Sequence, residues 1–167
     1  MKKLIFILSI LMASPVMAKT VAISGHTVLK AGDYVWNDTD STQGSVKIQV
    51  NLSTQMIYVY RDDTIIGTAN ISSGRKDYDT PIGMFSVLGK EENHWSKHYK
   101  AEMPFTMWLT NDGVALHSGI TPGYKSSHGC IHLPNQFAID LFQVVDKGTV
   151  VTIEKSDDPV GDLIASL

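Results

Sequence analysis

Cysteine is almost absent from this sequence, which contains a single one, Cys130. One thiol cannot form an internal disulfide, so it is a buried inert thiol, an intermolecular link or a functional thiolate. Basic runs are also absent, and the formal net charge is −3. A mildly acidic chain without a basic patch is a poor candidate for binding nucleic acid or an anionic membrane.

Long apolar runs are absent apart from the ten residues Leu4 to Ala13 near the N-terminus. A membrane anchor is the alternative interpretation, but a membrane-spanning helix needs about 20 apolar residues. The run follows two lysines and precedes Val16 and Ala18, which suit the −3 and −1 positions of a cleavage site. This pattern predicts a secretory signal peptide, residues 1–18, and therefore export to the periplasm or cell envelope.

Cleavage would leave residues 19–167, with a formal charge of −5 and no further apolar span of membrane length. That length suits one domain with a core of its own. Exported proteins usually pair their thiols, so a lone cysteine in this compartment is informative, and the residues around it must decide among its three possible roles.

Strand patterns dominate the remainder of the chain. Residues 19–44 are polar and irregular and predict an N-terminal arm or a short strand pair, and residues 155–167 predict a peripheral tail. Alternating or β-branched segments between them predict about seven short strands, at 45–50, 56–60, 64–71, 80–88, 103–109, 114–117 and 149–153. Phe137, Leu141 and Val145 recur at helical spacing after Pro134 and predict one amphipathic helix. The fold class that follows is mainly β, a sandwich or barrel with one main helix packed on it.

Residues 89–102 are charged and aromatic, without a clear period. We predict a loop here, either a flap over the central stretch described next or an ordinary solvated excursion.

The stretch from Leu116 to Pro134 is the chemical centre of the sequence. It contains Cys130 and three of the six histidines, His117, His128 and His132. An imidazole can take the proton of a cysteine nucleophile, and such pairing predicts a lowered thiol pKa and fast acylation. Gly129, directly before Cys130, would let backbone N–H groups turn toward one point and stabilise an oxyanion.

Two blander interpretations stand beside this one. Each histidine alone could be a hydrogen-bonded structural residue, and Gly129 alone predicts only a turn. A metal site is the other alternative, because the histidines and Cys130 offer nitrogen and sulfur ligands, and His94 and His98 have helical i, i+4 spacing. The segment that carries His94 and His98 does not have a helical pattern, and the HExxH motif is absent. We therefore predict no metal.

Ser127-His128-Gly129-Cys130-Ile131-His132-Leu133 resembles the SHGC-[IV]-R-[LM] signature of the L,D-transpeptidase (YkuD-type) catalytic domain family. His117-Ser118-Gly119 resembles the H-x-G element of that family, and the segment from Thr80 to Phe85 resembles its TPxGxF element. The likeness covers residues 45–154 in the expected order, which we take as the catalytic domain.

The resemblance implies a β-rich fold with the cysteine in a cleft beneath a flap, and peptidoglycan stem peptides as substrate. It implies Cys130 as nucleophile, His117 as general base, and the Ser118 carbonyl as the group that orients His117. His128 and Gly129 would line the oxyanion site, and His132 and Tyr124 would contact substrate. No metal or organic cofactor would be needed. Carbapenem-type inhibitors would acylate Cys130.

His132 departs from the family pattern, which usually has arginine there. Histidine is mostly neutral at pH 7, so a substrate carboxylate would be bound more weakly or in a pH-dependent way. The sequence leaves open whether the enzyme is a transpeptidase of cell-wall organisation and cell shape or a related L,D-carboxypeptidase or cross-link-cleaving hydrolase. A non-catalytic wall-binding module is the third alternative.

Overall fold

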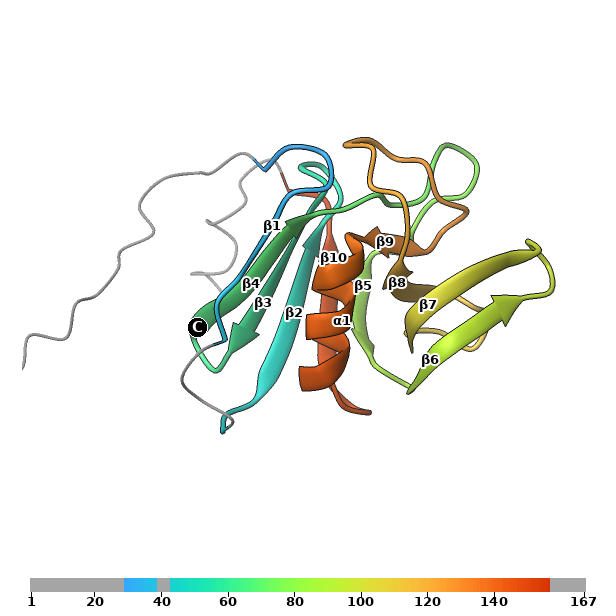
Figure 1. Cartoon of the computed structure of the whole chain (residues 1–167). Coiled ribbons are helices and arrows are strands. Elements are labelled where there is room, and N and C mark those ends of the chain that lie inside the picture. Colours follow the sequence, from blue (N-terminus) through green and yellow to red (C-terminus); the bar gives the residue numbers. More distant parts are fainter. Residues whose placement is uncertain (1–28, 39–42, 157–167) are drawn as a thin grey trace, which may run out of the picture.

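Two β-sheets and one helix make up the part of the protein that the computed structural model describes, residues 29–38 and 43–156 (Figure 1). The predicted signal peptide, most of the predicted tail and part of the predicted arm lie outside these residues. The mainly β fold with one main helix agrees with the class that the sequence predicts. No helix in the described part of the chain is long and apolar enough to cross a membrane.

The first sheet has six strands in the order β1-β4-β3-β2-β10-β5. Their bounds are β1 Tyr34–Trp36, β2 Val46–Asn51, β3 Met56–Arg61, β4 Thr64–Asn70, β5 Gly83–Ser86 and β10 Val150–Glu154. β2, β3 and β4 form an antiparallel meander, as their short connecting turns predict. The last strand, β10, pairs parallel with β2 and antiparallel with β5.

The second sheet has four strands in the order β6-β7-β8-β9. Their bounds are β6 Gly89–Ser96, β7 Ala101–Trp108, β8 Ala115–Ser118 and β9 Ile131–Leu133. β6 and β7 form a long antiparallel hairpin, whereas β8 and β9 are parallel. A parallel pair needs a long crossover, and residues 119–130 supply it. The chemical centre of the sequence is therefore this crossover and the strand ends on either side of it.

The helix α1 (Asn135–Val144) follows β9 directly and contacts β1, β7 and β8 (Figure 1). Its buried face, Phe137, Ala138 and Leu141, joins a hydrophobic core to which both sheets contribute. Because β9 leads straight into a helix anchored in this core, the strand that follows Cys130 has a fixed position.

One prediction from the sequence was wrong in detail. Residues 89–102 form most of the β6–β7 hairpin and not a loop. β6 is exposed at most positions, so it lacks the alternation that indicates a half-buried strand. The predicted arm contributes β1, which pairs with β4, and the Trp36 ring packs edge-on against Phe137 at a centroid distance of 5.4 Å.

Candidate active site

The parallel pairing of β8 and β9 places two of the central histidines side by side. His117 is the register partner of His132, and their ring centroids are 4.8 Å apart at an interplanar angle of 63°. Cys130 directly precedes β9. The ladder thus pairs residues 15 positions apart in the sequence, and Cys130 precedes Ile131, the register partner of Leu116.

His117 is a buried, neutral imidazole. Only 6% of its surface is exposed, and burial lowers its pKa to about 4, assisted by the neighbouring His132. Its Nδ1 lies 2.8 Å from the carbonyl oxygen of Ser118, the contact that the family resemblance implies. A neutral ring that donates Nδ1–H to this carbonyl keeps an unprotonated Nε2, which is the form a general base requires.

Cys130 is partly exposed, and its sulfur lies 3.5 Å from the carbonyl oxygen of Gly113. Burial raises the pKa of the thiol, and a hydrogen bond from the backbone N–H of Ala115 opposes this increase only in part. The prediction of a lowered thiol pKa was therefore wrong. A thiolate needs a cation nearby, and a neutral His117 does not provide one. At neutral pH the Cys130 thiol and the His117 imidazole are therefore both uncharged.

The loop that ends in Cys130 is fixed by hydroxyl groups. Ser127 Oγ donates to the carbonyl of Cys130 and accepts the N–H of Gly129 at 3.1 Å. Thr80, which is 4% exposed, donates to the carbonyl of Gly129 at 2.9 Å and accepts the N–H of Gly74 at 2.9 Å. Thr80 opens the TPxGxF-like element, and its contact with the cysteine loop was not foreseen from the sequence.

Gly129 contributes backbone freedom, because its φ is +111°, a region that side-chain-bearing residues rarely adopt. Its own N–H is engaged by Ser127 Oγ. That hydrogen bond argues against the expectation that the Gly129 N–H faces an oxyanion directly.

His128 is an exposed residue that contacts side chains from two other segments. Arg75 Nη2 lies 2.7 Å from its Nε2. The rings of Tyr78 and Tyr99 each have their centroids 4.8 Å from that of His128. Tyr99 belongs to the turn between β6 and β7, so the tip of the hairpin reaches the cysteine loop. No pattern in the sequence indicates these three partners, because they are 53, 50 and 29 residues away from His128.

The two residues expected to contact substrate have different settings. His132 is half-buried, and its Nδ1 lies 3.2 Å from the carbonyl oxygen of Ile120. Burial lowers the pKa of His132. Tyr124 is 64% exposed, and its backbone carbonyl accepts a hydrogen bond from the hydroxyl of Ser72 at 2.6 Å. His132 therefore adjoins His117, whereas within residues 29–38 and 43–156 the Tyr124 ring makes no hydrogen bond or ring contact with the site.

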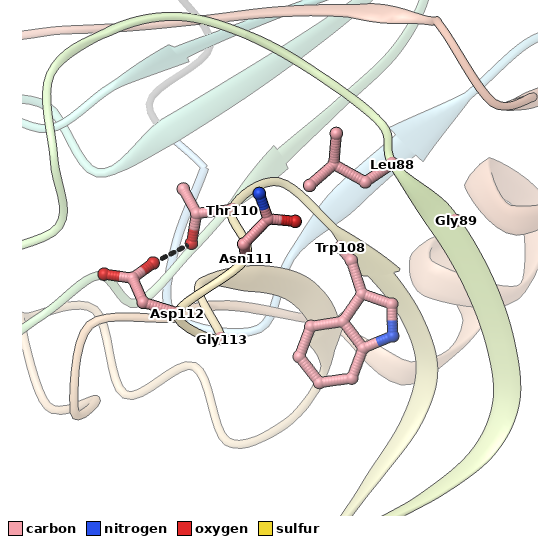
Figure 2. Close-up of a pocket in the computed structure, with 7 residues that line it drawn as sticks. All are labelled: Leu88, Gly89, Trp108, Thr110, Asn111, Asp112 and Gly113. Carbon is pink, nitrogen blue, oxygen red and sulfur yellow. Dashed lines mark hydrogen bonds between the residues drawn. The ribbon is translucent and has the colours of Figure 1, made fainter.

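A surface pocket of 460 Å³ lies between the start of β6, the end of β7 and the turn at 110–113 (Figure 2). Its lining residues are Leu88, Gly89, Trp108, Thr110, Asn111, Asp112 and Gly113. Gly113, whose carbonyl lies against the sulfur of Cys130, is the link between this pocket and the thiol.

Metal-ligating side chains do not gather anywhere in residues 29–38 and 43–156: no group of three or more His, Cys, Asp or Glu is placed to hold an ion. His94 lies on β6 and His98 in the turn after it, so the two do not share the face of a helix.

The family model of the L,D-transpeptidase catalytic domain (YkuD) matches residues 45–153. A Bacillus subtilis protein named as an L,D-transpeptidase, YqjB, is 29% identical over 126 residues, which cover 66% of this chain and 72% of that protein. The crystal structure of an L,D-transpeptidase from Stackebrandtia nassauensis superimposes with a TM-score of 0.62 at 27% identity, covering 72% of this chain and 60% of that one.

A further structural neighbour is L,D-transpeptidase 3 from Mycobacterium tuberculosis, solved in complex with a faropenem-derived adduct. Its TM-score is 0.61 at 22% identity, covering 66% of this chain and 60% of that one, so it supports the fold alone. The chain spans about three fifths of the length of these two solved structures.

Proposed function

The chain belongs to the L,D-transpeptidase catalytic domain family, and on that premise we propose that it is an exported cysteine L,D-transpeptidase acting on peptidoglycan stem peptides. One observation carries the proposal. His117 is buried and neutral, and its Nδ1 is hydrogen-bonded to the Ser118 carbonyl. It lies on β8, which pairs with β9, the strand that begins directly after the only cysteine of the sequence, Cys130.

The first half of the reaction follows from the two protonation states. The Cys130 sulfur attacks the carbonyl carbon of the bond between the L-centre of a diamino acid and a terminal D-alanine, while its proton passes to Nε2 of His117. The amine of D-alanine then leaves with that proton, and a thioester remains on Cys130. His117 is neutral again at the end of this half.

The second half reverses the roles of the groups. An amine from a second stem peptide attacks the thioester carbonyl and loses its proton to His117, and the Cys130 sulfur leaves and recovers that proton. The products are a cross-link and the free thiol. Every proton is returned, so these steps need no cofactor.

Three further expectations belong to this proposal. A signal peptide over residues 1–18 would deliver the enzyme to the periplasm or cell envelope, where its substrate lies. Its product would contribute to cell-wall organisation and cell shape. β-Lactams of the carbapenem type, and the related faropenem, would acylate Cys130, because a strained lactam carbonyl offers the same target as the peptide.

Purified disaccharide tetrapeptides test the proposal directly. We expect mass spectrometry to detect a cross-linked dimer and released D-alanine. A trimmed disaccharide tripeptide without any dimer would mean that water is the acceptor, and the enzyme would be an L,D-carboxypeptidase. Cleavage of a purified cross-linked dimer would identify the hydrolase of cross-links. If the folded protein changes neither substrate, the non-catalytic binding module is the better interpretation.

A further inference from the structure

Arg75, Tyr78 and Tyr99 form a cluster around His128 that the catalytic pair does not use. The Arg75 guanidinium lies 2.7 Å from Nε2 of His128 and 4.5 Å from the centroid of the Tyr78 ring. Tyr78 meets the His128 ring edge-on, and Tyr99 lies at 33° to it. Two separate segments, the one before β5 and the β6–β7 turn, thus converge on one imidazole in the cysteine loop.

The contact with Arg75 has only one chemically consistent form. A guanidinium offers N–H donors, accepts nothing and stays charged at every accessible pH. The His128 Nε2 must therefore accept, and the proton of the neutral ring must lie on Nδ1. The other tautomer, or the doubly protonated ring, would place two N–H groups against each other at 2.7 Å.

The backbone of Arg75 holds the same loop. Its N–H donates to the carbonyl of Ser127 at 3.0 Å, and Gly74 and Ser127 form an isolated parallel bridge. Side chain and backbone of Arg75 therefore fix His128 together. Among residues 29–38 and 43–156, no protein acceptor forms a hydrogen bond with Nδ1 of His128, which leaves this N–H available to a ligand.

We propose that Arg75 is a positioning residue that holds His128 in the Nδ1–H tautomer, so that the cysteine loop presents an N–H donor to an oxygen of the substrate. The identity of that oxygen, a carbonyl or a carboxylate of the stem peptide, rests on the proposed function. The tautomer itself rests only on the contact between Arg75 and His128.

The surroundings of His128 oppose its protonation from several elements. Its titratable and charged neighbours are Arg75 and Tyr78 from the segment before β5, His98 and Tyr99 from the hairpin turn, and His132 from β9. Partial burial, Arg75 and His98 lower the pKa of His128, in that order. Acid should therefore break the contact, because a protonated His128 would be a second cation facing Arg75.

The tautomer can be measured in the protein labelled with ¹⁵N-histidine, by long-range proton–nitrogen correlation at pH 7.5. The His128 signals are identified by their loss in His128→Gln. We expect an unprotonated Nε2 in the unchanged protein and in Lys76→Met, which removes the neighbouring exposed cation. In Arg75→Met we expect a mixture of tautomers. An Nε2–H tautomer in the unchanged protein, or a pure Nδ1–H tautomer in Arg75→Met, would overturn the proposal.

Acylation by faropenem tests the positioning role separately. We expect Arg75→Met to slow acylation about tenfold, which is the loss of one hydrogen bond to a charged group, while Lys76→Met leaves the rate unchanged. Arg75→Lys keeps a cation that only donates hydrogen bonds, so its acylation rate should be about threefold higher than that of Arg75→Met. No recovery would assign the loss to packing on Tyr78 and contradict the positioning role, as would a normal rate in Arg75→Met.

The outcomes also separate this proposal from the proposed function. If the unchanged protein is folded but never acylated, the proposed function fails. The nitrogen measurement still decides whether Arg75 sets the tautomer of His128.

Discussion

The two sheets bury different kinds of side chain. In the first sheet the buried positions of β2 and β3 are mainly apolar, such as Val50, Ile57 and Val59, and they feed the common core. In the second sheet all four residues of β8 are buried, yet two of them are His117 and Ser118. Burial of an apolar side chain adds stability, whereas burial of an imidazole changes its pKa.

The buried histidine therefore relies on the apolar core that both sheets share. Burying His117 and keeping it neutral costs free energy, and the apolar core supplies what offsets that cost. Thr80 and Arg75 lie between β4 and β5, two strands of the first sheet. Both form hydrogen bonds with the cysteine loop and so connect it to the first sheet.

The largest expected effect is on stability and comes from the core. Leu141→Ala removes a fully buried side chain of α1 and should lower the free energy of unfolding by about 2–5 kcal/mol. Chemical denaturation would measure it, with Met84→Ala, at a position 76% exposed, as the control. The rate of acylation by faropenem below the unfolding transition should stay within about twofold. A proportional loss of rate would show that core and site are not separable.

His117→Gln should do the reverse. Loss of the general base should slow acylation about 10²-fold or more, with little change in the denaturation midpoint. His94→Gln on β6 is the matched control and should stay close to the unchanged protein. A normal rate in His117→Gln would move the base role to His128.

Thr80→Val tests the connection between the sheets. It keeps the shape of the side chain but leaves the Gly129 carbonyl and the Gly74 N–H without their partner. We expect about 1–3 kcal/mol lower stability and about tenfold slower acylation, because the cysteine loop loses its anchor. The matched Thr152→Val, on half-buried β10, should change neither quantity appreciably. Equal effects from both substitutions would contradict the anchoring role of Thr80.

The smallest expected effect is that of mild acid on the acylation rate. With a pKa of about 4, His117 stays unprotonated as the pH falls from 7.5 to 5.5, so the acylation rate should remain nearly full. An ordinary histidine base with a pKa of about 6.5 would lose roughly nine tenths of its active form over this range. A rate profile that falls with a midpoint near 6.5 would contradict the buried, neutral state of His117.

Local pattern predicted the first sheet better than the second. Val46, Ile48 and Val50 alternate, and the strand they predict is present as β2. β6 was missed because its Lys90, Glu91 and Glu92 are exposed, and its pairing with β7 leaves no apolar alternation in the sequence. The helix was predicted from i, i+4 spacing because its buried face packs on the core.

In the site, too, contacts between neighbouring residues were predictable and contacts that depend on the fold were not. The contact of His117 with the Ser118 carbonyl joins adjacent residues, so a short motif was enough to suggest it. The raised pKa of Cys130 depends on how much of the folded chain covers the thiol, and residue spacing carries no information on that. Arg75 and Tyr99 reach His128 only through the fold.

The central claim is that Cys130 is the nucleophile of an acyl transfer. Intact-mass spectrometry after incubation with faropenem tests it most directly, using the unchanged protein and Cys130→Ala, with folding of both checked by circular dichroism. We predict one covalent adduct in the unchanged protein, located on the peptide that contains Cys130, and none in Cys130→Ala. A folded, unchanged protein that forms no adduct, or an equal adduct in Cys130→Ala, would contradict the claim.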